Sequence, residues 1–219
     1  MTQCVMYKLI SLVLVSVIIW TLPSFADWTS IDPAEFQMAD PPKPGSELHK
    51  EDFLEIHRLQ DGRKKSECAL AATQIAPTFK AFYASYASPL TNKEYAKAKP
   101  LLKRVFKLSE RITSFFKEKF QRQRPFNVDP TITPCVVRPK GAKSYPSSHA
   151  ALAAVGACIL SKLYPSKSVE LLQYGTYLGD LRVIVGVHHP SDVRAGQTLG
   201  IEICERLLSE DDFLDEIPN

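Results

Sequence analysis

Three features that mark other classes of protein are missing from this sequence. After Trp28, charged residues interrupt every apolar run, so no later stretch reaches the roughly 20 residues that a membrane-spanning helix needs. No segment alternates apolar and polar residues as a half-buried strand does, and no segment is repeated along the chain. The 219 residues, 45% hydrophobic and 23% charged, are ordinary for one globular domain. We therefore predict an all-α fold, a compact single-domain helical bundle.

Cysteine usage argues against a structural zinc site, because the spacing is wide and irregular and contains no CxxC pair. If Cys4 is removed with an N-terminal signal, the remaining cysteines are Cys68, Cys135, Cys158 and Cys204. In an oxidising compartment they can form two disulfides in any of three pairings, and buried free thiols suit Cys158 and Cys204 equally well. The sequence leaves the pairing open.

Residues 1–26 have the pattern of a signal peptide. Lys8 gives a positive start, 9–22 is apolar apart from three hydroxyl residues, and Ser24 and Ala26 are the small residues that a signal peptidase reads. We predict cleavage after Ala26 and a periplasmic or secreted protein. The alternative is an uncleaved membrane anchor, for which a run of 14 residues is short.

The rest of the chain divides by composition. Residues 27–45 form a Pro-rich N-terminal arm, 46–209 a helical domain, and 210–219 an acidic C-terminal tail. The tail holds five acidic residues and no base, and we expect it to be solvated and frayed. Without the signal and the tail the net charge is about +7, which can steer anionic substrates weakly.

Apolar periodicity and capping signals predict the helices of the domain. Thr91 followed by Glu94 has the spacing of a capping box, and Ser147 and Ser191 are expected to cap later helices. The proline-rich residues 125–145 are expected to form a loop. The helical segments are expected near residues 53–72 (with a break at 61–62), 79–86, 91–122, 150–163, 169–185 and 191–209.

The first cluster of candidate site residues is Lys117, Arg124 and Pro125. A separation of seven residues is two helical turns, so we expect Lys117 and Arg124 to project from one helix face and Pro125 to end that helix. Two cations on one stripe suit an anion with several negative oxygens. Basic pairs at this spacing are more often solvated surface, and we interpret three neighbours in that way: Lys119, Gln121 and Arg122.

The second cluster is Pro146-Ser147-Ser148-His149, at the predicted start of a helix. A helix N-terminus presents free amide N–H groups and partial positive charge, which suit a phosphate. The serines add hydroxyl donors, and His149 adds a group that titrates near neutrality. The alternative is simple helix capping, with His149 satisfied at the surface.

The third cluster is Arg182, His188 and Asp192. A carboxylate four residues after His188 can accept from one imidazole nitrogen and leave the other unprotonated. Arg182 adds a planar cation. A metal site that combines His188, His189 and Asp192 is an alternative, but no further Cys or Glu cluster completes it. We interpret His189 as a residue at the surface or behind His188, and His49 and His57 as structural residues.

Together the three clusters resemble the signature of the type 2 phosphatidic acid phosphatase superfamily, and in particular the secreted bacterial class A non-specific acid phosphatases. That signature is Lys, six residues and Arg-Pro, then Pro-Ser-Gly-His, then Ser-Arg, five residues, His, three residues and Asp. Here the blocks read KEKFQRQRP, PSSH and LRVIVGVHHPSD, so nine of the eleven fixed positions agree. Ser148 replaces the Gly and Leu181 replaces the first Ser, which bears on rate and substrate range rather than on the reaction.

This resemblance implies the fold shared by that superfamily and the vanadium haloperoxidases, with 46–209 as the phosphatase domain. It implies an acid phosphatase that hydrolyses small-molecule phosphate monoesters with no metal or other cofactor. His188 would attack phosphorus and form a phosphohistidine, Asp192 would orient it, and His149 would protonate the leaving group. The residues implied to bind phosphate are Lys117, Arg124, Ser147, Ser148 and Arg182.

Other activities fit the same signature. A phosphatase of lipid phosphates or isoprenyl diphosphates is one alternative, a vanadium haloperoxidase is another, and a secreted protein that has lost catalysis is a third. We expect no nucleic-acid partner and no stable membrane insertion once the signal is removed. The sequence leaves open the physiological substrate, transfer of phosphate to other alcohols, and the oligomeric state, and a homo-oligomer is compatible with it.

Overall fold

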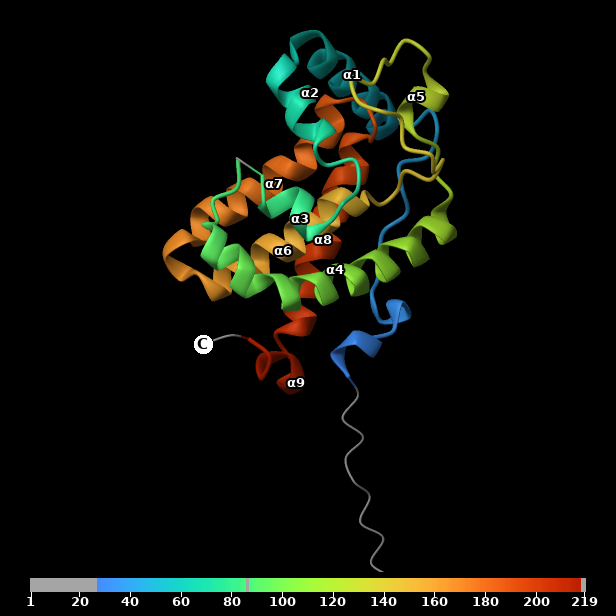
Figure 1. Cartoon of the computed structure of the whole chain (residues 1–219). Coiled ribbons are helices and arrows are strands. Elements are labelled where there is room, and N and C mark those ends of the chain that lie inside the picture. The colour runs from blue at the N-terminus through green and yellow to red at the C-terminus, as the bar shows by residue number, and fades with distance from the viewer. Residues whose placement is uncertain (1–26, 86, 218–219) are drawn as a thin grey trace, which may run out of the picture.

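Three long helices form the centre of the molecule in the computed structural model, which describes residues 27–85 and 87–217. They are α6 (Ser148–Leu163), α7 (Ser168–Ile184) and α8 (Pro190–Leu207), and α6 packs against both of the others. The longest helix, α4 (Asn92–Phe120), packs against α6, and in Figure 1 it runs along the lower side of this group. The predicted signal peptide, residues 1–26, lies outside the described residues.

Shorter elements complete the fold. Helices α1 (Glu47–Gly62) and α2 (Lys65–Ala72) lie at the end of the molecule opposite α9 (Asp211–Leu214) (Figure 1). Within the described ranges the only pairing of extended backbone is one isolated bridge, so the predicted all-α class is confirmed. The remaining elements are η1 (Trp28–Ser30), η2 (Pro33–Glu35), α3 (Phe79–Tyr83), α5 (Pro125–Val128) and η3 (Pro165–Lys167).

Most predicted helix starts agree with the structure. Thr91 and Glu94 form the expected capping box of α4, and the Ser147 hydroxyl accepts from the backbone N–H of Ala150 at 3.3 Å at the start of α6. One cap was wrong. His189, not Ser191, caps α8, because Pro190 takes the first helical position, where its missing N–H costs nothing.

The centre of the bundle depends on a close approach of α6 and α8. Helix α6 is rich in alanine and is buried around most of its circumference. Where α8 crosses it, a Cβ added to Gly200 would overlap the carbonyl oxygen of Ala151. The disulfide between Cys158 and Cys204 joins the same two helices. Small residues therefore let the two backbones approach, and the disulfide fixes them there.

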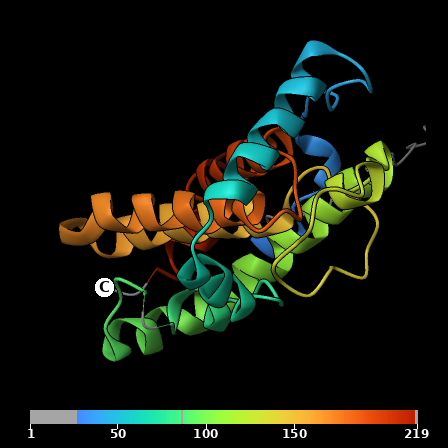
Figure 2. The same cartoon turned by 90° about the horizontal axis from the view of Figure 1, so that it is seen from above.

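The second disulfide, Cys68–Cys135, ties α2 to the long segment between α5 and α6. This segment passes beside the turn between α7 and α8, where the Cys135 N–H donates to the Val185 carbonyl at 3.3 Å. Seen from above (Figure 2), it is the yellow loop near the end of α4. The pairing that the sequence left open is thus resolved, and it secures a loop that leads into the second candidate cluster.

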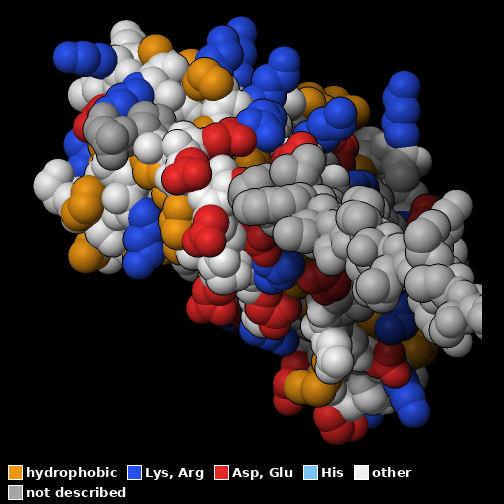
Figure 3. Space-filling view, turned by 90° about the horizontal axis from the view of Figure 1, so that it is seen from below, with side chains coloured by type: hydrophobic (Ala, Val, Ile, Leu, Met, Phe, Trp, Pro, Cys, Tyr) orange, Lys and Arg blue, Asp and Glu red, His pale blue; other side chains and the backbone are white. Residues whose placement is uncertain are grey.

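The acidic end of the chain is packed, contrary to the expectation that it is frayed. Phe213 in α9 is fully buried and contacts the ring of Trp28 edge-on at 5.2 Å between centroids. The Trp28 N–H donates to Asp212 at 2.8 Å, so the arm and the tail hold each other. The space-filling view from below (Figure 3) shows charged side chains of both signs, with Asp and Glu gathered near the middle of that face.

In the ranges that the structure describes, no helix combines the length and apolarity needed to cross a bilayer.

Replacing Gly200 by Ala should destabilise the protein, because the added methyl group would meet backbone that cannot rotate away. We expect the free energy of unfolding to fall by about 1–3 kcal/mol in urea titrations. The matched control is Gly62→Ala in α1, where no atom lies within 4 Å of the added Cβ. Equal stability of Gly200→Ala and the wild type would contradict the close approach of α6 and α8.

Candidate active site

His188 lies in the short turn between α7 and α8. Gly186 has a positive φ of 77°, which lets the chain reverse there, and the His188 N–H donates back to the Arg182 carbonyl at 3.2 Å. The imidazole is only 2% exposed. Its Nδ1 lies 3.3 Å from Oδ2 of Asp192, and its Nε2 lies 3.0 Å from Nη1 of Arg124. A guanidinium can only donate, so Nε2 is the unprotonated nitrogen and Nδ1 carries the hydrogen.

Asp192 is fully buried at the first turn of α8 and is shared by several donors. Its Oδ2 accepts from His188, from the His189 N–H at 2.9 Å and Nδ1 at 3.1 Å, and from the Ser144 hydroxyl. Its Oδ1 accepts from Arg122 at 2.7 Å. Burial alone would raise the pKa of Asp192, but the hydrogen bonds from His188 and His189 and the charge of Arg122 hold it well below the ordinary value.

His149 sits in the first turn of α6, as the second cluster predicts. Its Nε2 lies 2.7 Å from the carbonyl oxygen of Gln74, so this nitrogen carries a hydrogen. Ser147 joins the second and third clusters directly, because its backbone N–H donates to the Asp192 carbonyl at 2.9 Å. Because Gln74 lies in the connection between α2 and α3, His149 is buried beneath that connection and is not satisfied at the surface.

Lys117 and Arg124 reach the site by different routes, which corrects the sequence argument that one helix face carries both. Helix α4 ends at Phe120, where Gln121 adopts a left-handed conformation with φ 52°. Arg124 then directly precedes α5. Pro125 is the first residue of α5, so it begins a helix and does not end one as predicted. The Lys117 ammonium donates to the Pro146 carbonyl at 2.6 Å, and Arg124 donates to the carbonyls of Gly141 and Val187 at 2.7 and 2.8 Å.

Arg182, in the last turn of α7, is the third cation. It is 2% exposed, yet its Nε and Nη1 have no hydrogen-bond partner. Within the described part of the chain, Lys117, Arg124 and Arg182 bond to carbonyl groups, to a histidine or to nothing, and none forms an ion pair with a carboxylate. Buried cations left in this state are stabilised by a bound anion.

Burial lowers the pKa of all three cations and of the two histidines, and the charges of neighbouring cations add to this for Lys117, Arg182 and both histidines. Burial and the charge of Arg124 lower the pKa of Lys117 to about 7, and burial lowers the pKa of Arg124 and Arg182 to about 10. Burial and the charge of Arg124 hold the pKa of His188 well below its ordinary value. Burial and the charge of Arg182 do the same for His149. Both imidazoles are therefore neutral at pH 7.

The two departures from the signature have different surroundings. Leu181 is fully buried in the main hydrophobic core, where it packs with other apolar side chains. The position is therefore occupied by a core residue rather than by a hydroxyl at the site. Ser148 is the first residue of α6 and is partly exposed, so its side chain has room beside the helix terminus.

Sequence reasoning missed a buried residue beside the site. Arg122, interpreted as solvated surface, instead has a largely buried side chain that donates to Asp192 at 2.7 Å and to Asp52 at 2.8 Å. His189, expected at the surface or behind His188, is almost fully buried. The available signal was Asp52, an acidic residue four positions before Ile56 and thus on the buried face of α1.

Comparison with solved structures defines the class of fold. A bacterial vanadium-dependent iodoperoxidase superposes with a TM-score of 0.67 at 13% sequence identity, over 84% of this chain and 56% of that one. At this identity the likeness concerns the fold alone. The prediction of a helical bundle of the vanadium haloperoxidase kind is confirmed.

Sequence comparison gives the family. The profile of the PAP2 superfamily matches residues 105–207. A non-specific acid phosphatase of Providencia stuartii is 30% identical over 182 residues, covering 79% of this chain and 73% of the relative. An acid phosphatase of Zymomonas mobilis is 27% identical over 184 residues, covering 80% and 69%. This chain belongs to the PAP2 superfamily, and the predicted resemblance to bacterial non-specific acid phosphatases is confirmed.

The pKa of Lys117 predicts how anion binding depends on pH. Sulfate keeps its charge between pH 6 and pH 9, whereas Lys117, with a pKa of about 7, loses its proton as the pH rises through 7. Below pH 7 the ammonium is charged and sulfate binds most tightly. Above pH 7 we expect the affinity, measured by calorimetry, to fall by up to about tenfold per pH unit.

The control for this experiment is Lys117→Arg, which stays charged over the whole range. Its affinity for sulfate should change little between pH 7 and pH 8.5, because Arg124 and Arg182, with pKa values of about 10, also remain charged. A wild-type affinity that is equally flat over this range would contradict the assignment of Lys117 to the anion site.

Proposed function

We propose that this chain, an acid phosphatase of the PAP2 superfamily, hydrolyses phosphate monoesters through a covalent phosphohistidine on His188 and needs no metal ion. The observation that carries the proposal is the buried guanidinium of Arg182, which has two nitrogens without a hydrogen-bond partner and whose charge acts on His149. An unpaired buried cation is costly, and a phosphate with several negative oxygens would satisfy it.

The proposed phosphate seat combines the three cations with the start of α6. Lys117, Arg124 and Arg182 would bond the phosphoryl oxygens, together with the hydroxyl of Ser147 and the free N–H groups of Ser148 and His149. Helix N-termini favour anions through these N–H groups and through the helix dipole. Fixed positive charge around the equatorial oxygens is most of what phosphoryl transfer requires, which is why we propose that a metal ion is not needed.

His188 has the hydrogen-bond pattern of a nucleophile. Its Nδ1–H points to Asp192 at 3.3 Å, which leaves the Nε2 lone pair directed away from the carboxylate. In the structure that lone pair accepts from Arg124 at 3.0 Å. When phosphate draws the guanidinium to its own oxygens, Nε2 is released. It then attacks phosphorus, the N–P bond forms, and the P–O bond to the leaving group breaks. Asp192 stabilises the positive imidazole that results.

His149 would supply the proton for the leaving oxygen. Its pKa is lowered by burial and by the surrounding cations, so His149 is neutral before substrate binds. A bound phosphate dianion reverses the local charge and raises this pKa, so His149 takes up a proton as substrate binds. It donates that proton to the leaving alkoxide, then takes one from the water molecule that hydrolyses the phosphohistidine. Activity should therefore be highest at mildly acidic pH.

We propose small-molecule phosphate monoesters as substrates and a periplasmic or secreted location. Two disulfides support an oxidising compartment, and the signal-like pattern of residues 1–26 agrees with export. The relative from Providencia stuartii is described as a non-specific acid phosphatase, which favours a broad substrate range.

Replacing His188 by Ala should abolish turnover and leave oxyanion binding in place, because the three cations remain. In the wild type, a rapid alkaline quench during turnover should trap phosphate on His188, detected by mass spectrometry, and EDTA should not change the rate. The control is His57→Ala, whose imidazole pairs with Asp129 and which no proposed step involves. Near-normal turnover by His188→Ala in EDTA would refute the nucleophile assignment.

Replacing His149 by Asn should slow hydrolysis in a way that depends on the leaving group. An alkoxide needs a proton to leave, so alkyl phosphates should lose about 10²–10⁴-fold in kcat. p-Nitrophenolate leaves without help, so p-nitrophenyl phosphate should lose much less. His57→Asn serves as the control. If both substrates slow by the same factor, His149 is not the proton donor.

A further inference from the structure

A buried group of charged residues lies next to Asp192. We refer to Arg122, Asp52, Ser191 and Asp192 as the Arg122 cluster. The side chains of Arg122, Asp52 and Asp192 are 8%, 1% and 0% exposed. The guanidinium of Arg122 bridges the two carboxylates, with Nη1 at 2.7 Å from Oδ1 of Asp192 and Nη2 at 2.8 Å from Oδ2 of Asp52. It also donates to the Ser191 hydroxyl at 2.7 Å.

The two oxygens of Asp192 have separate partners. Oδ1 faces Arg122, whereas Oδ2 faces His188, His189 and Ser144. Without a donor on Oδ1, the carboxylate could rotate about its Cβ–Cγ bond, and the two oxygens would exchange places. Arg122 opposes that rotation, and so keeps Oδ2 beside Nδ1 of His188.

Arg122 is itself held by α1. Oδ2 of Asp52 accepts a hydrogen bond from Nη2 of Arg122, and Oδ1 of Asp52 accepts from the Ser191 N–H at 2.9 Å. Asp52 and Ile56 lie on the buried face of α1, so the position of this helix is coupled to the orientation of Asp192. Three elements, namely α1, the segment after α4 and the start of α8, meet at one guanidinium.

Stability alone explains this arrangement poorly. Taking two carboxylates and a guanidinium out of water is expensive, and apolar side chains of similar volume often serve a core as well or better. What the charges add is a fixed geometry. We propose that Arg122, anchored by Asp52, is a positioning residue that aligns Asp192 with His188. This inference rests on the proposed function, in which His188 is the nucleophile.

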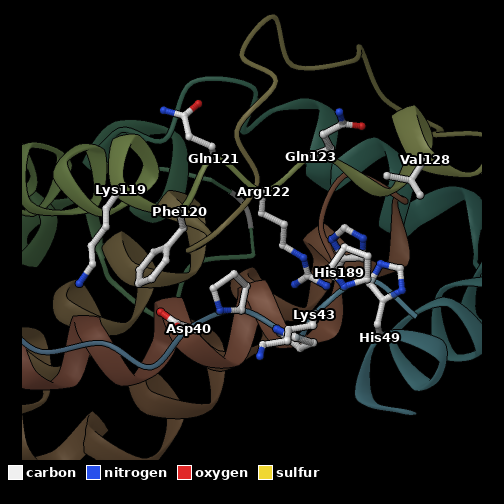
Figure 4. Close-up of a pocket in the computed structure, with 13 residues that line it drawn as sticks. Asp40, Lys43, His49, Lys119, Phe120, Gln121, Arg122, Gln123, Val128 and His189 are labelled. Carbon is white, nitrogen blue, oxygen red and sulfur yellow. The ribbon is translucent and has the colours of Figure 1, made fainter. Parts of the chain in front are cut away.

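Arg122 can also be reached from outside. It lines a pocket of 650 Å³ together with Lys43, Lys119, Phe120, His49 and His189. In Figure 4 its side chain extends between Phe120 and His189, and its guanidinium end lies next to His189. A small cation can therefore enter the space that the Arg122 side chain would leave. Truncation followed by chemical rescue is thus a practical test at this position.

The test is Arg122→Ala, assayed on p-nitrophenyl phosphate with and without methylguanidinium. We expect kcat to fall by about 10²-fold, because a small misplacement of a catalytic group can cost that much in rate. KM should change by less than about threefold, because Arg122 is not among the residues proposed to bind phosphate. Methylguanidinium should raise the kcat of Arg122→Ala by at least about tenfold. The matched control is Arg111→Ala, which removes a guanidinium that bonds the carbonyls of Thr29 and Ile31. It should keep full activity and show no rescue.

A double-mutant cycle with Asp192→Asn separates positioning from a general structural effect. If Arg122 acts through Asp192, Arg122→Ala should change kcat by less than about threefold in the Asp192→Asn background. An equal loss in both backgrounds, a wild-type kcat in Arg122→Ala, or no rescue would overturn the proposal. If circular dichroism shows that Arg122→Ala does not fold, Arg122→Lys replaces it in the double-mutant cycle. Lysine keeps the positive charge, but one ammonium cannot bridge both carboxylates.

This cycle is read from the rate of ester hydrolysis, whereas the phosphohistidine is detected by trapping. The two proposals can therefore fail separately. A wild-type enzyme that hydrolyses the ester without a trapped intermediate would refute the nucleophile assignment alone. Additivity between Arg122 and Asp192 in an enzyme that does form the intermediate would refute the positioning role alone.

Discussion

Three positive charges, on Lys117, Arg124 and Arg182, are buried in one place, and among the residues that the structure describes none of them forms an ion pair with a carboxylate. The rest of the site follows from that constraint. The chain satisfies Lys117 with backbone carbonyls, and Arg124 with two carbonyls and His188. Arg182 keeps two nitrogens without partners. Burial, together with the charges of neighbouring cations, lowers the pKa of both imidazoles. A site of this kind favours a dianion, and its protonation state changes when the dianion binds.

The scaffold keeps these groups in place through a few tight connections. The close approach of α6 and α8 at Gly200 and the disulfide between Cys158 and Cys204 fix the two helices that carry His149 and Asp192. The Ser147 N–H donates to the Asp192 carbonyl and joins the two clusters directly. Because these connections are backbone contacts and a covalent bond, the geometry depends little on mobile side chains.

The sequence was sufficient for features that are encoded locally. The capping box at Thr91, the cap at Ser147 and the all-α class all follow from short patterns of residues, and the three-block resemblance identified the superfamily. It was insufficient where distant segments meet. The route of Arg124 depends on a left-handed Gln121 that ends α4, which no periodicity reveals. Arg122 looked like a surface residue because its partners, Asp52 and Asp192, are each 70 residues away in the chain.

The proposed mechanism requires that two imidazoles flank one phosphorus atom that three cations surround. The most direct test is a crystal structure of the mature protein with bound vanadate. Our account predicts that vanadium is bonded to Nε2 of His188, with Lys117, Arg124 and Arg182 on the equatorial oxygens and His149 beside the apical oxygen. Vanadate bound elsewhere, or bound here with either imidazole turned away from it, would contradict the account.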